Sequence, residues 1–316
     1  ATLFWSDSRI QYVEGYALDR FSMGELMLRP VRTQQVGLLL DAGIEEELRH
    51  RHLQVAEACR TSLGLNIGPV VITEEPLEIK LAKGSSGSSW GGLDKVDTLL
   101  KAGEKLKKAG ATAIAIVTRF PDDVGSEVLD SYRHGVGVDN LGGAEAVISH
   151  LLVRHLGLPC AHAPALTALP LEAELDPRAA GEELGHTFLT CVLVGLSRAP
   201  DLLPVNFEQS FENSSLSNCI HADHLGAVVA PNGALGGEAI LACLERNVPL
   251  IVVSNPNVLR VTSQSLRSKG DGLLKDNLFV LHASNYVEAA GLILLLREGI
   301  NIDSLYRPLS KIVIID

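Results

Sequence analysis

The chain of 316 residues has a formal net charge of −11, which disfavours a nucleic-acid partner because a phosphate backbone requires a basic surface. Hydrophobic residues make up 46% of the sequence but aromatic residues only 4%, so the core must consist of Ala, Val, Leu and Ile, as in folds that alternate helices with buried parallel strands. The five cysteines include no CxxC pair, so we expect neither a structural zinc nor a disulfide scaffold, but a reducing compartment. No apolar stretch reaches the length of a membrane span, and we expect no membrane partner.

Apolar runs that predict buried strands alternate along the chain with patterns that predict helices. The chain starts at once with strand-like residues, 1–16, which suggests a truncated, processed or mis-started chain. We then predict strands at 36–43, 68–76 and 111–123, a short buried segment at 158–166, helices at 44–64, 93–110, 142–157 and 180–199, and loops at 84–92 and 131–140. In the second half we predict strands at 225–231, 248–256 and 276–283 and helices at 233–247 and 284–299.

This alternation predicts an α/β fold with two Rossmann-like lobes, mainly parallel sheets and a ligand cleft between the lobes. Residues 196–220 have little periodicity and are predicted to cross from an N-terminal lobe, residues 1–195, to a C-terminal lobe, residues 221–316. Ligands of such sheets bind beyond the carboxyl ends of the strands, so the loops at those ends are the candidate binding segments.

Two predicted strand-to-helix turns share a glycine pair that is followed by a glutamate. They are PNGALGGEAI, with Asn232, Gly236, Gly237 and Glu238, and DNLGGAEAVI, with Asp139, Gly142 and Gly143. Glycines let the backbone approach a ligand closely, and the free N–H groups of a helix start favour an anion, although Glu238 would repel one. The alternative is a helix start that packs tightly on the sheet, and both interpretations stay open. Because one turn lies in each predicted lobe, we expect both to face one cleft.

Three further segments carry polar side chains suited to ligand binding. The loop at 84–92 contains Ser85, Ser86, Ser88 and Ser89 among glycines, and it is either a phosphate or carboxylate cradle or a plain surface loop. Arg119, near the end of a predicted strand, is the candidate anion clamp, and the alternative for it is a local ion pair. The candidate acids and bases are Asp122, Asp123 and His134, and the candidate ligand contacts in the interlobe crossing are Asn213, Ser214 and Ser215.

Several stretches resemble a domain-of-unknown-function family, number 3326, found in cyanobacteria, other bacteria and photosynthetic eukaryotes. The resemblance rests on YVEGYALDRF, TRFPDD, HGVGVDNLGGAEAVISHLLVRHLGLPCAHAPAL and VAPNGALGGEAI, and it runs to the end of the chain. The family has no established activity, so the resemblance implies no catalytic residues. Its members begin with a further glycine-rich unit, which implies that part of the binding site can lie outside this chain.

We therefore expect a soluble enzyme of the cytoplasm, or of the chloroplast stroma in a photosynthetic eukaryote, that acts on a small polar metabolite bearing a carboxylate or phosphate. Hydrolysis, group transfer and isomerisation stay open, as does the cofactor, although no GxGxxG or P-loop spacing is present. The alternative is a non-catalytic metabolite sensor or assembly factor. Convergence of Arg119, Asp122 and His134 on one cavity would favour the enzyme. The apolar composition and the abrupt start also predict a homo-oligomer.

Overall fold

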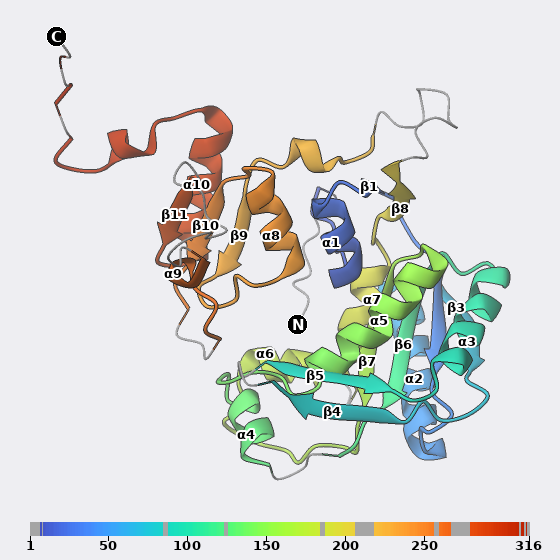
Figure 1. Cartoon of the computed structure of the whole chain (residues 1–316). Helices are drawn as coiled ribbons and strands as arrows, with labels where there is room; N and C mark the ends of the chain where they lie inside the picture. Colours follow the sequence, from blue (N-terminus) through green and yellow to red (C-terminus); the bar gives the residue numbers. More distant parts are fainter. Residues whose placement is uncertain are drawn as a thin grey trace. The chain divides into compact units, whose positions relative to one another are not determined.

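The computed structural model describes residues 7, 9–84, 88–122, 126–183, 187–205, 218–255, 259–266, 279–309, 311–312 and 314. The chain divides into two compact units, Ala1–His221 and Ala222–Asp316, and each is described by itself (Figure 1). No helix in the described part of the chain is both long and apolar enough to span a bilayer.

The first unit is built on a parallel sheet of four strands. Their order is β3 (Ile67–Ile72), β2 (Val36–Leu40), β6 (Ala113–Arg119) and β7 (Cys160–Ala165). All five residues of β2 are buried, as are the first six of β6, which explains why these strands appear in the sequence as continuous apolar runs. The prediction of an α/β fold with mainly parallel strands is confirmed.

Helices cover both faces of this sheet (Figure 1). They are α2 (Glu46–Leu63), α3 (Val96–Lys108), α5 (Gly142–Leu156) and α7 (Leu189–Leu196). Alternate residues of the strands pack with α2 and α7 in one apolar cluster that includes Leu38, Ala115, Ala163, Ala56 and Leu193. On the other face, α3 and α5 contact one another, and Leu106 of α3 approaches Gly37 of β2.

The remaining elements of the first unit differ most from the prediction. They are α1 (Gly15–Ser22), α4 (Glu127–Arg133), α6 (Pro177–Glu182), the antiparallel pair β1 (Leu26–Arg29) with β8 (Asp201–Pro204), and the antiparallel pair β4 (Ile79–Lys83) with β5 (Ser89–Leu93). The predicted loop at 84–92 therefore ends in a strand, and the predicted loop at 131–140 begins in a helix that Ser126 caps at its N-terminus. The predicted helix at 180–199 is replaced by α7 and the end of α6. No described residue before α1 belongs to a strand.

The second unit has a smaller parallel sheet. Its order is β11 (Val280–Ala283), β10 (Leu250–Val253) and β9 (Val228–Pro231). The helical elements are η3 (Ala222–His224), α8 (Glu238–Glu245), α9 (Ser263–Leu266), α10 (Tyr286–Glu298) and η4 (Ile302–Leu305). Leu250 and Val252 pack in a cluster with Leu244 of α8, while Ile251 and Val253 pack on the opposite side with Leu292 of α10. Both faces of β10 are therefore buried, as its apolar run predicts.

Candidate functional site

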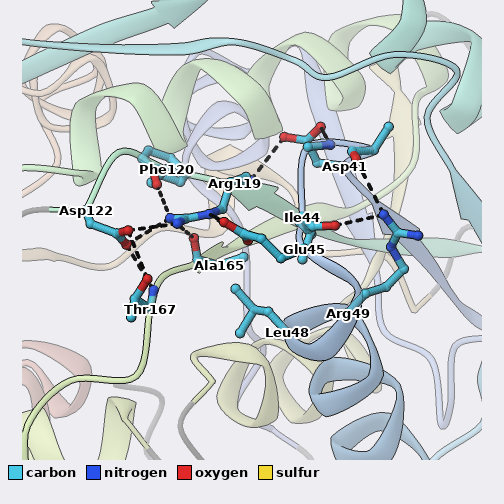
Figure 2. Close-up of polar contacts among 12 residues, drawn as sticks. Asp41, Ile44, Glu45, Leu48, Arg49, Arg119, Phe120, Asp122, Ala165 and Thr167 are labelled. Carbon is cyan, nitrogen blue, oxygen red and sulfur yellow. Dashed lines mark hydrogen bonds and ion pairs between the residues drawn. The ribbon is translucent and has the colours of Figure 1, made fainter.

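Arg119 ends β6 at the carboxyl edge of the first sheet. Its guanidinium donates to the two oxygens of Asp122 at 2.9 and 2.8 Å, and its Nε lies 2.9 Å from an oxygen of Glu45 (Figure 2). Asp122 also accepts hydrogen bonds from the amide and the hydroxyl of Thr167. The guanidinium holds the pKa of Asp122 well below its usual range. These are the contacts of a local ion pair, and an anion could reach Arg119 only by displacing Asp122 or Glu45.

The buried carboxyl group of Asp41 connects three segments at the same edge. Its Oδ1 accepts hydrogen bonds from the amides of Gly43 and Leu77 at 2.9 and 3.1 Å. Its Oδ2 accepts one from the amide of Arg119 at 3.0 Å (Figure 2). Burial raises the pKa of Asp41, although these hydrogen bonds oppose the shift. Because its partners are backbone amides, Asp41 fixes the loops that leave β2 and β6.

A cavity of about 230 Å³ lies beside this edge, within the first unit. Ionisable side chains and apolar side chains share its wall: the former are Tyr12, Asp122, Tyr132, Arg133, Asp139, Glu145, His162, Glu182, Glu183 and Cys191, and the latter include Leu129, Leu141, Leu166, Leu169, Phe188 and Val192. Five carboxyl groups therefore face one guanidinium. A mainly apolar pocket with a few convergent polar groups is the usual form of a small-molecule site.

Glu145, in the first turn of α5, is an acid without a compensating charge. Only 7% of the residue is exposed, yet it lines the cavity. Its Oε2 lies 3.6 Å from Nε2 of His162, and its carboxyl group has no hydrogen bond to another described residue. Burial, and then the charges of Asp139 and Glu182, raise the pKa of Glu145 well above its usual range. Glu145 therefore retains its proton at pH values at which Asp122 is ionised.

Hydrogen bonds behind Glu145 set the state of His162. Oγ of Ser149 donates to Oε1 of Glu14 at 2.7 Å and lies 3.0 Å from Nδ1 of His162. Since the hydroxyl proton points to Glu14, we infer that His162 donates through Nδ1, which leaves Nε2 as an acceptor toward Glu145. Burial lowers the pKa of His162 to about 4, so the ring is neutral near pH 7. A neutral acceptor beside Glu145 favours the protonated carboxyl group.

Asp139 and Tyr132 complete the acidic part of the cavity. Oδ1 of Asp139 accepts a hydrogen bond from the amide of Leu141 at 2.8 Å, just before α5 begins. Burial raises the pKa of Asp139 as well, and its charge contributes to the shift at Glu145. The hydroxyl of Tyr132 donates to Glu182 at 2.9 Å. Asp139 and Glu145 therefore titrate as interacting groups of one cavity.

Arg133, at the end of α4, is buried and already neutralised. It donates to Glu183 at 2.9 and 3.2 Å, to Glu172 at 3.0 Å and to the carbonyl of Pro170 at 2.8 Å. These bonds join α4 to the segment between β7 and α6 and to Glu183, which follows α6 and lines the cavity. Arg133 is thus a structural cation and not a free anion site.

His134 lies next to Arg133 but does not line the cavity. Its Nε2 is 2.8 Å from Oε1 of Glu172, and its Nδ1 is 2.8 Å from the carbonyl oxygen of Asp130. That carbonyl oxygen, followed by the nearby carboxylates, raises the pKa of His134. Asp130, His134 and Glu172 offer ligand atoms within 4.8 Å of one another and are the described residues that could together hold a metal ion. Arg119, Asp122 and His134 do not converge on one cavity, because only Asp122 lines it.

The glycine pair at the start of α5 supports close packing. A Cβ at Gly143 would overlap the backbone of Ser89 and Trp90, whereas the nearest atom to a Cβ at Gly142 is 3.7 Å away. The amide of Gly143 donates to Oγ of Ser89 at 3.1 Å, and Ser88 is exposed beside it. Strand β5 thus covers the start of α5, which is the packing alternative for this turn.

The corresponding turn in the second unit has more space. Gly236, Gly237 and Glu238 are exposed, and no atom lies within 4 Å of a Cβ at Gly237, where α8 is capped. Helix–sheet packing therefore does not explain Gly237. The amide of Asn232 donates to Val253, and its buried Oδ1 has no hydrogen-bond partner among the described residues. Ligand binding by these residues stays a prediction.

Six predicted ligand or catalytic residues lie outside the described part of the chain: Ser85, Ser86, Asp123, Asn213, Ser214 and Ser215. Conversely, Tyr12, Tyr132, Glu145, His162 and Glu182 line the cavity and were not predicted. A signal for Glu145 exists in the sequence, because Glu145, Ser149, Leu152 and Leu156 repeat at helical spacing. A glutamate and a serine on the apolar face of a helix indicate a buried polar site.

The chain is an α/β protein with a parallel sheet and an acid-lined cavity in its first unit. Residues 1–306 match the family described as "Protein of unknown function (DUF3326)", and the chain belongs to this family, as the resemblance predicted. It is 47% identical over 301 residues to a protein named "Uncharacterized lipoprotein syc1174_c" from Synechococcus sp. (strain ATCC 27144 / PCC 6301 / SAUG 1402/1), covering 95% of this chain and 79% of that protein. No solved structure is significantly similar to the chain.

The relative corrects the expected location. We expected a cytoplasmic or stromal protein because the spacing of the cysteines indicates a reducing compartment and no apolar stretch is long enough to span a membrane. A relative named a lipoprotein points instead to a membrane-anchored location. The prediction failed because a lipid anchor requires no apolar helix in the polypeptide, so hydropathy does not reveal it.

Proposed function

We propose that the cavity of the first unit is the active site of an enzyme that transfers a proton to or from a small polar metabolite. The observation that carries this proposal is Glu145: a buried carboxyl group that faces the cavity without a hydrogen-bond partner among the described residues. A structural carboxyl group at this depth would normally be paired, because burying it alone costs free energy. A proton donor or acceptor with its pKa displaced toward neutrality is what acid–base catalysis requires.

The lining changes our expectation about the metabolite. A carboxylate or phosphate would meet five carboxyl groups, and Arg119 and Arg133 are already bound by Glu45, Asp122, Glu172 and Glu183. An anionic reacting group is therefore disfavoured by repulsion. Hydrolysis, group transfer and isomerisation all use proton transfer of this kind, and the chemistry of Glu145 does not select among them.

Proton transfer by Glu145 is testable without a known substrate. Native mass spectrometry of the purified chain would first reveal a retained small molecule. Wild-type protein and Glu145→Gln would then be incubated with a small-molecule extract of Synechococcus and the extract followed by mass spectrometry. We expect the wild type to convert one compound at least a hundredfold faster than the variant. Equal conversion by both proteins refutes the role of Glu145, and a compound that is retained but never converted supports the alternative of a metabolite sensor.

Two further expectations remain proposals. We propose that the two units are Rossmann-like lobes, since each has a parallel sheet with helices on both faces. We also propose that the chain forms a homo-oligomer at a membrane surface, since α10 exposes Tyr286, Val287 and Leu294 and a relative is named a lipoprotein. A monomer in light scattering at micromolar concentration would contradict the oligomer.

A further inference from the structure

We propose that the metabolite bound in this cavity carries a protonated amine, which binds to the carboxyl groups of Asp139 and Glu145. This inference rests on the proposed function, because it assigns a substrate class to the same cavity. It follows from the charges that remain uncompensated, from the unused acceptor atoms of Glu145 and from the aromatic part of the wall.

The ionisable lining separates into paired and unpaired acids. Asp122 is bound by Arg119 at 2.8 Å and Glu183 by Arg133 at 2.9 Å, so neither needs another cation. Among the described residues, Asp139 and Glu145 have no ion pair to lysine or arginine. The ionisable neighbours of Glu145 are the acids Asp139 and Glu182 and the neutral ring of His162. A cation that enters the cavity would thus meet two carboxyl groups that no lysine or arginine neutralises.

The carboxyl oxygens of Glu145 that accept no hydrogen bond also fit an amine. Glu145 is 7% exposed, and its oxygens accept no hydrogen bond from a described residue. An ammonium group supplies three N–H donors and no acceptor, which complements a pair of carboxyl groups. A hydroxyl would supply one donor, and a phosphate none when fully ionised.

Aromatic rings stand beside these acids. Tyr12, Tyr132 and Phe188 line the same cavity, in a chain whose aromatic content is only 4%. Ring faces attract cations that have lost water, and sites for ammonium groups commonly combine rings with carboxylates. The apolar remainder of the wall would cover the carbon skeleton of the ligand.

An ammonium group would also change the protonation of Glu145. Arg133 lines the same cavity, but Glu172 and Glu183 neutralise it. The other ionisable groups of the wall besides Glu145 are Tyr12, Asp122, Tyr132, Asp139, His162, Glu182, Glu183 and Cys191. None of them supplies a positive charge near pH 7, so the pKa of Glu145 is raised by burial and by its acidic neighbours. A bound cation opposes both causes, and Glu145 then releases its proton and becomes the base for catalysis.

Matched four-carbon probes test this inference on the full chain: 1,4-diaminobutane, 1,4-butanediol and succinate, titrated calorimetrically near pH 7. We expect the diamine to bind at least tenfold more tightly than the diol, and succinate not to bind. Titrations in two buffers of different ionisation enthalpy should show release of close to one proton with the diamine. Glu145→Gln should weaken diamine binding at least tenfold and abolish the proton release.

Glu74→Gln is the control, because it removes one exposed carboxylate of the same unit, 56% exposed and paired with Lys105, and should leave diamine binding unchanged. Thermal unfolding of both variants verifies that they fold. Equal binding of the diamine by wild type and Glu145→Gln, or tighter binding of succinate, overturns the amine. If the diol alone binds and Glu145→Gln abolishes its binding, the amine is wrong but the cavity remains the site. If no probe binds and no metabolite is converted, the proposed function fails as well.

Discussion

Replacing Glu145 by glutamine should make the first unit more stable at neutral and alkaline pH. The carboxyl group is buried beside Asp139 and Glu182, and its pKa is raised well above the usual 4.5. A raised pKa means that the folded state holds a proton that the unfolded state has lost. The wild type therefore loses stability as the pH rises from about 4.5 to the folded-state pKa, and the loss is then constant. The glutamine side chain has the shape of the glutamate side chain but does not titrate.

The size of this stability difference follows from the single proton that Glu145 binds in the folded state. Within this pH window the free energy of unfolding of Glu145→Gln, minus that of the wild type, should rise by up to about 1.4 kcal/mol per pH unit. Urea unfolding from pH 4 to 9 measures it. Trp90 belongs to the first unit, so its fluorescence follows the unfolding of that unit.

The control for this experiment is again Glu74→Gln. A hydrogen bond from Lys105 lowers the pKa of Glu74, so its titration lies below pH 4.5 and its stability difference should be constant from pH 5 to 9. If the difference for Glu145→Gln is also constant above pH 5, or falls as the pH rises, the carboxyl group is not protonated in the folded protein and the reasoning about the cavity is wrong.

Four other substitutions test the packing of the loops. Gly143→Ala should lower the free energy of unfolding by about 3 kcal/mol because its Cβ would overlap Ser89. Gly142→Ala, whose Cβ would have its nearest atom 3.7 Å away, should change it by less than about 1 kcal/mol. Chemical denaturation of both variants measures the difference. Asp41→Ala should cost about 3 kcal/mol, since three backbone N–H groups lose their acceptor, and a wild-type melting temperature would contradict this. Gly237→Val should cost no more than about 1 kcal/mol, the effect of a poorer helix cap, and a larger loss would show that the turn is closely packed.

The sequence predicts the main sheet well and the cavity poorly. Strands β2 and β6 are buried on both faces, so their apolar runs are visible without any knowledge of their neighbours. The pair β4 and β5 was missed because Ser89–Leu93 is rich in glycine and serine and forms a strand only by pairing with Ile79–Lys83. Short helices such as α4 depend on a single cap, Ser126, within a polar stretch.

The residues of the cavity were harder to predict because their chemistry comes from burial. Asp139 was selected for its place before a helix, and that place is where the structure puts it. Glu145 stands in the same glycine-rich turn, but nothing local distinguishes a buried glutamate from one that merely favours a helix start. Arg119 lies at a strand end as predicted, and its ion pair with Glu45, far away in sequence, is the alternative that the sequence left open.

The anchoring of the cavity wall by Arg133 has a consequence for how that wall moves. The segment from Pro170 to Glu183 is held to α4 through one guanidinium that binds two carboxylates and a carbonyl. Swinging this segment outward would separate opposite charges and hydrate them, rather than expose an apolar core. Dissolved sodium chloride screens charges once they are exposed to solvent, and so lowers the cost of separating them. Outward movement of this segment should therefore depend on ionic strength, and hydrogen exchange of its amides should be faster in concentrated sodium chloride than in dilute buffer.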